Sequence, residues 1–541
     1  MKKLINQPDR AVDEMVEGLL ASHAGLARLS RHTVLLRSDA ASVRDQQVAL
    51  ISGGGSGHEP AHAGYIGHGM LSAAVAGEVF TSPSTDSVLA AIRAVGGKPG
   101  VLLIVKNYTG DRLNFGLAAE LARTEGIKVE TVIVADDIAL AQSEENAGRR
   151  GLAGTVFVHK VAGAAAAEGL PLAQIAAIAQ AAANQVATMG LSFSSAAEVE
   201  LGRGIHGEPG VSRIAFTSAD DLAKRLVEQI ASEHQLKPHE RIAVMINNLG
   251  ATPPIELAIF ARQALSLLHL RKLVIERVYT GTFLSSLDTA GVSLSLLRVD
   301  DDRLRRLDAP TTAPAWPNPC TEAPGPWQDR VIPSIARHPA RKPRPLPGNK
   351  TQHALEAICR ALIASESRLT ELDQAIGDGD LGINLARAAR AIESALPTYP
   401  LDDLIETVQQ LAWTLQDVLA GSSGPLYGVF LLRAAASLET GASVANAVTE
   451  GCQAISELGG AAAGDRTMLD ALLPFADTLA KEQNLERAVE AAEKAAEATG
   501  QIIPRRGRAS YLGKRALGSP DPGAIAAAIW LRALVDSLQR A

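Results

Sequence analysis

Residues 306–350 are dense in proline and lack hydrophobic periodicity, and they separate two halves of the 541-residue chain that differ in character. The segment contains the stretches APTTAPAWPNPCTEAPGPW and HPARKPRPLPGNK. Proline fixes φ and lacks a backbone donor, so such a run disfavours both helix and central strand. We therefore predict an extended linker between two domains, with a structured loop folded against one domain as the alternative. The chain length also exceeds what one hydrophobic core usually supports.

Residues 1–305 alternate between short aliphatic runs and alanine-rich stretches of helical periodicity, such as 160–189. This alternation predicts an α/β domain built around mainly parallel sheets, whose ligands bind at the carboxyl ends of strands. The predicted strands are 48–52, 101–105, 129–134, 242–247 and 292–299.

Residues 351–541 contain little that resembles a strand. Apolar residues recur at helical spacing, and glycine-rich breaks separate the periodic segments. The sequence predicts an all-α domain whose inter-helix loops carry polar chemistry, and a helical module joined to an α/β module suggests that two ligands are brought together. The periodic segments are 353–364, 402–419, 486–499 and 523–539.

The overall charge is mildly acidic, with 59 acidic and 52 basic residues giving a net charge of −7. Without a basic stripe, nucleic acid and anionic membrane are poor candidates as partners. No apolar stretch approaches the roughly 20 residues that span a bilayer. The N-terminal MKKLINQPDR turns polar too early for a secretory signal, and three widely spaced cysteines suit reduced thiols. We expect a cytoplasmic protein.

Three glycine-rich or polar turns in the first half could bind a small ligand. In GGGSGH, Gly55, Ser56 and Gly57 let backbone amides approach closely, and His58 stands at the rim as a donor or proton relay. In KNYTGDRLNFG, Lys106 can bind an oxygen and Asp111 can accept a proton, although a loop pair of this kind is commonly a solvated ion pair. The third turn, GRGIHGEPG at 202–210, leaves the ring of its histidine sterically free, which by itself is unremarkable.

The segment HEPAH at 58–62 also satisfies the zinc-binding pattern HExxH, and His68 falls where a third ligand would lie. That pattern requires a helix, yet Pro60 lies between the histidines and a glycine run precedes them. Zinc hydrolysis is therefore disfavoured against a structural histidine pair or a role in the ligand turn.

The second half carries a cluster of aspartates, Asp373, Asp378 and Asp380, in LDQAIGDGDLGIN. Carboxylates this close repel unless a cation neutralises them, and hard oxygen ligands select Mg²⁺ or Ca²⁺. The spacing is not that of an EF-hand. Later turns could bind phosphate, although each could equally be a helix cap, and together they favour a Mg-nucleotide site. These turns are Gly421–Gly424, GDRTMLDAL at 464–472, GRASYLGKR at 507–515 with Arg508 as a possible charge clamp, and SPDPG at 519–523.

The strings GGGSGHEPAH, KNYTGD, GIHGEPG, GDGDLGIN, GSSGPLYG, GDRTMLDAL and GRASYLG resemble, in order, those of the dihydroxyacetone kinase family in its single-chain, ATP-dependent form. The resemblance covers nearly the whole chain. It implies a ketone-binding K-type domain of two α/β subdomains at 1–305, the linker at 306–350, and a nucleotide-binding L-type domain at 351–541. A homodimer is also implied.

For the K-type domain, the resemblance implies that His206 forms a covalent hemiaminal with the ketone carbonyl carbon, which selects ketoses over glycerol. Asp111 would be the general base on the terminal hydroxyl, and His58 would assist. Lys106 and the backbone and side chains of Gly55, Ser56 and Gly57 would complete the substrate site.

For the L-type domain, the resemblance implies an eight-helix barrel in which Asp373, Asp378 and Asp380 hold two Mg²⁺ ions. The γ-phosphate of ATP would pass directly to the ketose hydroxyl. The implied nucleotide contacts are Leu381, Gly382, Ile383, Asn384, Ser422, Ser423, Gly459, Thr467, Met468, Arg508, Asp521, Pro522 and Gly523.

One departure from the family pattern lies between TMGLSFSS at 188–195 and GRGIHGEPG, where the chain is shorter than is usual. The substrate could therefore be a four-carbon ketose such as erythrulose. An FAD-AMP lyase side activity that forms cyclic FMN is a further alternative. A non-catalytic ketone sensor and a kinase that takes phosphate from a protein are disfavoured, because the chain retains a fused nucleotide domain.

Overall fold

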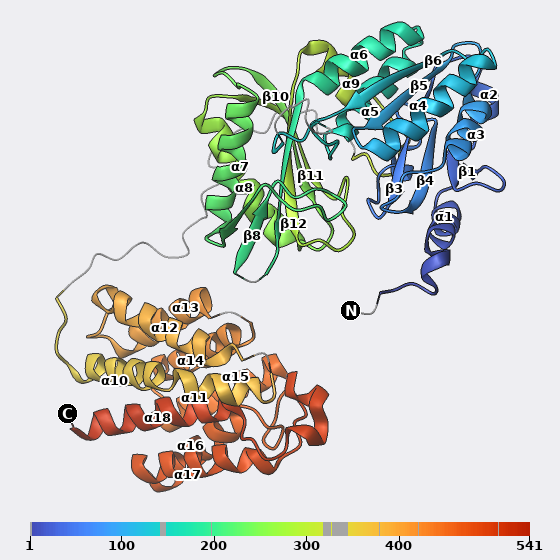
Figure 1. Cartoon of the computed structure of the whole chain (residues 1–541). Coiled ribbons are helices and arrows are strands. Elements are labelled where there is room, and N and C mark those ends of the chain that lie inside the picture. The colour runs from blue at the N-terminus through green and yellow to red at the C-terminus, as the bar shows by residue number, and fades with distance from the viewer. Residues whose placement is uncertain are drawn as a thin grey trace. The chain divides into compact units, whose positions relative to one another are not determined.

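A computed structural model describes residues 3–140, 148–195, 197–317, 326, 345–377, 379–419, 421–506 and 508–540. The chain forms two compact units, Met1–Pro333 and Ser334–Ala541 (Figure 1). The N-terminal unit is α/β with two sheets and the C-terminal unit is all-helical. The predicted fold classes are therefore confirmed.

The first sheet has six strands, of which four adjacent ones, β4, β3, β5 and the edge strand β6, are mutually parallel. Successive residues of β3 and β5 point to opposite faces. Leu50, Leu102 and Ile104 pack with α5 (Thr155–Ala167) and α6 (Leu172–Asn184), whereas Ile51 and Leu103 pack with α3 (Thr85–Val95) and α4 (Thr109–Thr124). The buried aliphatic runs thus form strands because helices cover both faces. In spatial order the strands are β1 (Leu26–Arg28), β2 (Val34–Arg37), β4 (Ala73–Val79), β3 (Ala49–Ser56), β5 (Val101–Lys106) and β6 (Val129–Val134).

The second sheet also has six strands, but only β10 and β11 are parallel neighbours. The expectation of mainly parallel sheets is therefore wrong for this sheet. Strands β7, β8 and β9 are joined by connections too short for a crossover, so they run antiparallel. Helices α7 (Ala219–Glu233) and α8 (Pro254–Leu270) share its hydrophobic core. In spatial order the strands are β11 (Val274–Gly281), β10 (Arg241–Asn248), β12 (Gly291–Arg298), β7 (Val186–Phe193), β8 (Glu198–Leu201) and β9 (Ser212–Ala215).

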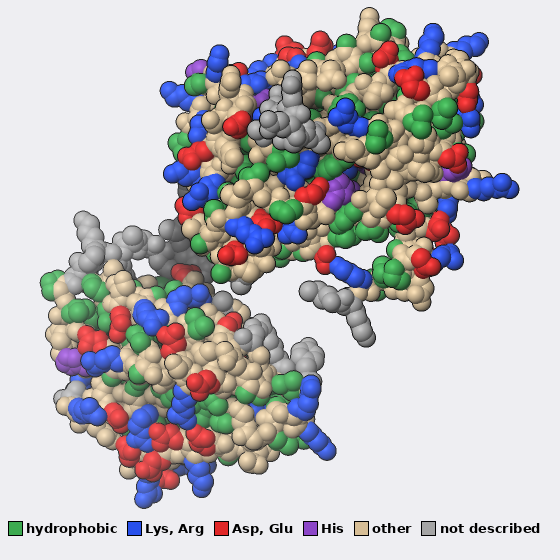
Figure 2. Space-filling view, in the orientation of Figure 1, with side chains coloured by type: hydrophobic (Ala, Val, Ile, Leu, Met, Phe, Trp, Pro, Cys, Tyr) green, Lys and Arg blue, Asp and Glu red, His purple; other side chains and the backbone are tan. Residues whose placement is uncertain are grey.

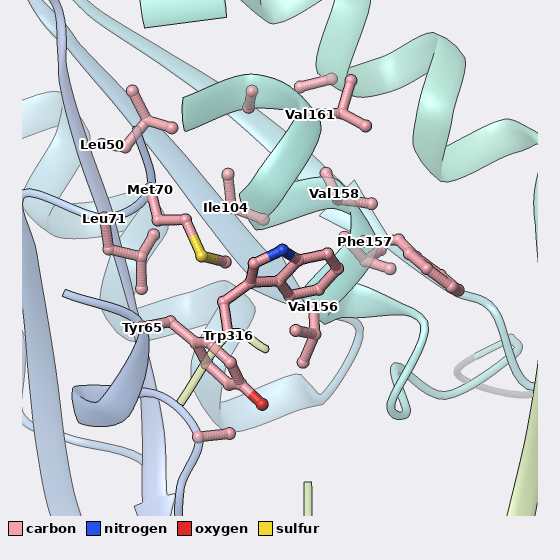
Figure 3. Close-up of a cluster of buried hydrophobic side chains, with 14 of the residues drawn as sticks. Leu50, Tyr65, Met70, Leu71, Ile104, Val156, Phe157, Val158, Val161 and Trp316 are labelled. Carbon is pink, nitrogen blue, oxygen red and sulfur yellow. The ribbon is translucent and has the colours of Figure 1, made fainter. Parts of the chain in front are cut away.

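The N-terminal unit continues beyond residue 305. Helix α9 (Asp301–Asp308) crosses the expected boundary, and Trp316 is buried in the core of the unit, near Tyr65 and Phe157 (Figure 3). The first residues of the proline-rich segment are therefore packed on this unit, in the manner of the structured-loop alternative. Most of the rest of the segment lies outside the described residues.

The C-terminal unit is a closed ring of eight helices, α10 and α12 to α18, in which each helix contacts the next and α18 returns to α10. The short α11 packs on α12 and α18. This arrangement is the helical barrel that the resemblance implied. The helices are α10 (Lys350–Ala364), α11 (Glu366–Gln374), α12 (Leu381–Ala395), α13 (Leu404–Val418), α14 (Ser423–Glu439), α15 (Val444–Gly459), α16 (Leu469–Glu482), α17 (Leu485–Ala498) and α18 (Pro522–Arg540).

Smaller elements also occur among the described residues. The remaining α-helices and 3₁₀ turns are η1 (Pro8–Arg10), α1 (Ala11–Ser22), α2 (Ala40–Val43), η2 (Ala63–Tyr65), η4 (Leu396–Thr398), η5 (Thr499–Gln501) and η6 (Arg508–Ala516). Within the described ranges, none of the helices is both long and apolar enough to cross a bilayer. Acidic and basic side chains are interspersed over the visible face of both units (Figure 2).

Candidate active site

A cluster of polar residues lies where β3 and β5 end. Lys106 is the last residue of β5, and Asp111 lies in the first turn of α4. A Cβ built on Gly54 would lie 3.3 Å from Lys106 Nζ and 3.6 Å from Asp111 Oδ2. Both charged groups therefore converge on the space that the missing side chain of Gly54 leaves. Adjacent parallel strands bring these turns to one edge of the sheet, as the sequence predicts.

The Lys106 side chain is fully buried, and its Nζ has no hydrogen-bond partner among the residues that the structure describes. Burial lowers the pKa of Lys106, while the charges of Asp111 and Glu208 oppose that shift. A buried donor without a partner is costly unless a ligand or water satisfies it. The ammonium is therefore available to a small ligand bearing an oxygen.

His58 is buried and carries its proton on Nδ1, because this nitrogen lies 2.8 Å from the carbonyl oxygen of Ser285, which can only accept. Within the described part of the chain, the Nε2 atom of His58 has no hydrogen-bond partner. Burial, followed by the charges of Lys106 and His206, holds the pKa of His58 well below its usual value. The ring is neutral at pH 7, and its Nε2 can accept a hydrogen bond from a ligand hydroxyl.

His206, in the turn between β8 and β9, is surrounded by aromatic rings. The His206 ring centroid lies 4.8 Å from that of His58, 5.4 Å from that of Phe80 and 4.5 Å from that of Tyr108. The structure thus brings His206 beside His58. Lys106 Nζ lies 5.6 Å from the centroid of the same Tyr108 ring. We use the name ketone cluster, after the ligand that the family resemblance implies, for His58, Lys106, Asp111 and His206.

Three residues of this neighbourhood were not singled out from the sequence: Phe80, Tyr108 and Glu208. Tyr108 and Glu208 lie inside the quoted motifs KNYTGD and GIHGEPG, so the motifs themselves carried the signal. Phe80 follows β4 outside any motif, and it stacks on His58 with ring centroids 5.2 Å apart. Its φ of 56° is unusual for a bulky residue, and residues in such conformations cluster at functional sites.

The two histidines of HEPAH do not converge as zinc ligands. His62 lies beside Ser52 Oγ and His159, whereas His58 lies beside His206. The segment 58–62 is not an α-helix. Among the described residues, no group of three or more His, Cys, Asp or Glu side chains is arranged to hold a metal.

The C-terminal unit contains a pocket of about 570 Å³ at one end of the helical barrel. The helices α12, α14, α16 and α18 all begin at or beside its wall, at Leu381, Ser423, Leu469 and Pro522. Helix N-termini offer free backbone N–H groups and partial positive charge. Four of them at one pocket make an anion site suited to phosphate groups.

Most of the predicted nucleotide residues line this pocket, whereas Gly382 and Ile383 do not. Gly382 packs against α11, where an added Cβ would lie 2.2 Å from the Glu366 carbonyl oxygen, and Ile383 is exposed. The side chain of Arg508 and the whole of Asp378 lie outside what the structure describes. The predicted residues that line the pocket are Asp373, Asp380, Leu381, Asn384, Ser422, Ser423, Gly459, Thr467, Met468, Asp521, Pro522 and Gly523.

Asp373 and Asp380 stand on the same wall of the pocket. Asp373 Oδ2 accepts hydrogen bonds from the backbone N–H groups of Asp380 (2.9 Å) and Leu381 (3.1 Å), which folds the loop. Asp380 is exposed, and its side chain caps no backbone group of α12. Two carboxylates beside an anion site fit Mg²⁺, which binds few protein ligands and takes the rest from phosphates and water.

Arg466 and Asp521, which follow the aspartate loop at a distance in the sequence, also line the pocket. Burial raises the pKa of Asp521 to about 6, although a hydrogen bond from Ala524 N and the Arg466 charge oppose the shift. Arg466 is buried and donates to the carbonyl oxygens of Ile502 and Ser519. It therefore ties together the loops that form this wall, a role that its sequence motif did not indicate.

Comparisons with known proteins match both units. Residues 17–315 match the Dak1 domain and residues 375–536 the DAK2 domain. The chain is 45% identical to triokinase/FMN cyclase from Homo sapiens, with 99% of each chain covered. It is 39% identical to dihydroxyacetone kinase from Citrobacter freundii, with 98% of each covered. The crystal structure of C. freundii dihydroxyacetone kinase in complex with AMP-PNP and Mg²⁺ is similar, with a TM-score of 0.66, 38% identity and 99% of each chain covered.

An α/β unit with a buried polar cluster, fused to a helical barrel with an anion pocket, defines a two-domain phosphotransferase. The full-length matches make the assignment specific. The chain belongs to the dihydroxyacetone kinase family, in the form that carries Dak1 and DAK2 domains in one polypeptide.

Proposed function

We propose that this protein is an ATP-dependent kinase that phosphorylates a terminal hydroxyl of dihydroxyacetone. The observation that carries the proposal is the ketone cluster, in which His58 Nε2 and Lys106 Nζ are buried without a hydrogen-bond partner among the described residues, beside His206 and Asp111. The names of the full-length relatives, a dihydroxyacetone kinase and a triokinase, support the substrate class.

Each member of the ketone cluster has a proposed role. The Nε2 atom of His206 bonds to the carbonyl carbon, and the resulting hemiaminal distinguishes ketoses from glycerol. Asp111 accepts the proton of the terminal hydroxyl as that oxygen attacks phosphorus. His58 Nε2 accepts a hydrogen bond from a substrate hydroxyl, and Lys106 donates to the former carbonyl oxygen. Gly55, Ser56 and Gly57 complete the substrate site.

The pocket of the C-terminal unit is the proposed site of ATP. The phosphates of ATP would face the helix N-termini at Ser422, Ser423 and Thr467. Apolar residues of the pocket wall, such as Leu426 and Leu458, would pack against the adenine base. Asp373 and Asp380, with Asp378 in the same loop, would hold Mg²⁺, which supplies neutralisation of phosphate charge. Arg508 stays a proposed charge clamp on the transferring group.

The domain and assembly assignments belong to the same proposal. Ketone binding is assigned to residues 1–305 and nucleotide binding to residues 351–541, joined by the segment 306–350. A cytoplasmic homodimer is proposed from the family resemblance. Light scattering coupled to size-exclusion chromatography tests the dimer, which a monomeric mass at micromolar concentration would exclude.

An assay of ADP release tests the kinase proposal directly. The purified chain with ATP and Mg²⁺ is offered dihydroxyacetone, erythrulose, five-carbon ketoses and glycerol, and formation of cyclic FMN from FAD is followed in parallel. We expect ADP release with small ketoses and little with glycerol. Absence of ketose-dependent ADP release would contradict the kinase proposal, and cyclic FMN formed without any ketose kinase activity would replace it with a lyase.

A lyase side activity is the second candidate function, because the human relative is named triokinase/FMN cyclase and matches over the full length. Its reaction needs a nucleotide pocket but no ketone adduct. A variant that lacks the His206 imidazole should therefore retain cyclic FMN formation, if the wild type forms it, while losing kinase activity.

Phe80 should limit the length of the ketose, because its ring stacks on His58 and meets the edge of His206. We expect Phe80→Ala to raise kcat/KM for erythrulose relative to dihydroxyacetone by about tenfold, the size of effect that one carbon produces in a fitted pocket. Steady-state kinetics on both ketoses measure the ratio. Phe216→Ala, which removes an exposed ring at the edge of the second sheet, is the control. An unchanged ratio in Phe80→Ala would show that Phe80 does not limit the length of the ketose.

A further inference from the structure

The turn that carries His206 is folded around the side chain of Glu208. Glu208 Oε2 accepts a hydrogen bond from the backbone N–H of His206 at 2.8 Å, so the carboxylate turns back over its own loop. A Cβ built on Gly204 would lie 2.2 Å from Glu208 Oε2 and 2.5 Å from Arg150 Nη1. Glycine at 204 is therefore what leaves room for the carboxylate and the guanidinium.

The second carboxylate oxygen of Glu208 contacts the imidazole itself. Glu208 Oε1 lies 3.1 Å from His206 Nδ1. An ionised carboxylate can only accept, so in the neutral imidazole this contact places the proton on Nδ1 and leaves the lone pair on Nε2. Burial disfavours the charged carboxylate, but the hydrogen bonds from His206 prevail and lower the pKa of Glu208 to about 2. Glu208 is therefore ionised at neutral pH.

Arg150 anchors the start of the same turn. Its Nη2 donates to the carbonyl oxygen of Gly202 at 2.6 Å, and its Nε donates to Asp137 Oδ2 at 2.7 Å. Arg150 and Asp137 are both buried, so this ion pair is shielded from solvent.

The ring of His206 contacts Glu208 on one side, and the rings of His58, Phe80 and Tyr108 lie on its other sides.

We propose that Glu208 is the positioning residue that makes His206 a nucleophile: it holds the Nδ1–H tautomer, fixes the ring and balances the charge that develops on it. This inference rests on the proposed ketone chemistry of His206. The same carboxylate would have no catalytic use if His206 only bound a ligand by hydrogen bonding.

In the proposed step the Nε2 lone pair forms the C–N bond, and the π electron pair of the C=O bond moves to oxygen. That oxygen takes a proton from the Lys106 ammonium, which becomes a neutral amine. His206 keeps its Nδ1 proton and becomes an imidazolium, whose positive charge faces the Glu208 carboxylate. Reversal of the same transfers releases the ketose and restores the ammonium.

The test compares Glu208→Gln and Glu208→Ala in the full chain. Gln keeps an acceptor for Nδ1–H but removes the charge, and Ala removes both. We expect the equilibrium constant for adduct formation, from intact-mass titration with dihydroxyacetone, to fall about tenfold in Glu208→Gln and about a hundredfold in Glu208→Ala. Because the proposal gives Glu208 a role in adduct formation and none in phosphoryl transfer, KM for the ketose should rise by these factors while kcat at saturation changes less than threefold.

The ¹⁵N NMR spectrum of His206 gives a readout that loop damage alone would not mimic. Wild type and Glu208→Gln should show Nδ1–H, and Glu208→Ala should show mixed tautomers. Glu200→Gln is the matched control, because Glu200 is also a buried carboxylate near this turn but pairs with Arg203 and Arg213. It should form adduct as the wild type does.

Wild-type adduct formation in Glu208→Ala, or an unchanged tautomer of His206 in that variant, would overturn the inference. An equal collapse of kcat in Gln and Ala variants would also do so, since it would show a structural role. Failure of the proposed function is distinguishable, because then the wild type itself would form no adduct with dihydroxyacetone.

Discussion

Replacing His206 with alanine is expected to abolish the covalent ketone adduct and to lower kcat/KM for dihydroxyacetone by about a thousandfold, or about 4 kcal/mol of transition-state stabilisation. The reason is geometric. In the proposed step the Nε2 atom of His206, whose ring is held among His58, Phe80 and Tyr108, bonds to the carbonyl carbon, and the variant lacks that atom. The ketose would then be bound only by hydrogen bonds, which glycerol can also make.

The preference for dihydroxyacetone over glycerol is therefore the most informative readout for this variant. We expect it to fall toward unity in His206→Ala, measured by ADP release with each substrate. His68→Ala is a suitable control, because His68 is exposed and lies outside the ketone cluster. An undiminished preference for the ketose in His206→Ala would rule out the covalent role of this histidine.

Replacing Asp380 with asparagine is expected to weaken Mg²⁺-dependent nucleotide binding at least tenfold while leaving the ketone adduct unchanged. Asp380 lines the barrel pocket beside Asp373, and in the described residues its exposed side chain does not cap α12, so the change removes charge while leaving the start of this helix intact. A neutral amide is a poorer ligand for Mg²⁺ than a carboxylate. Isothermal titration with AMP-PNP, with and without Mg²⁺, measures the effect.

Asp477→Asn supplies the matched control for that experiment, since Asp477 is an exposed aspartate on α16 and does not line the pocket. Its affinity for the nucleotide should equal that of the wild type. An equal loss of ketone adduct in Asp380→Asn would show that the two ligand sites are not divided between the units as we propose.

Much of the fold follows from local patterns in the sequence. The aliphatic runs at 101–105 and 129–134 form β5 and β6, because helices cover both faces of the first sheet and select continuous apolar strands. The antiparallel direction of most of the second sheet could not be predicted in this way, since a buried strand reads alike in either direction. The packing of Trp316 also escaped prediction, because its partners lie far away in the chain.

The candidate site was predictable where chemistry is concentrated in a short motif. Lys106 and Asp111 share one turn, and Asp373 and Asp380 share one loop, so their proximity is encoded locally. The approach of Phe80 to His58 and His206 depends on the packing of β3, β4 and the turn before β9, and no periodicity indicates it. The contact of Glu208 with His206 could not be predicted for a different reason. The two residues are only two positions apart, but their side chains meet only because the turn adopts a geometry that Gly204 permits.

A single-turnover experiment tests the central claim most directly. The wild-type chain is mixed with dihydroxyacetone, the covalent adduct is quantified by intact-mass spectrometry, and ATP with Mg²⁺ is then added. The account predicts that the mass increases by one ketose and that the adduct is lost at the rate at which dihydroxyacetone phosphate appears. Formation of the phosphate at full rate without any detectable adduct would contradict it.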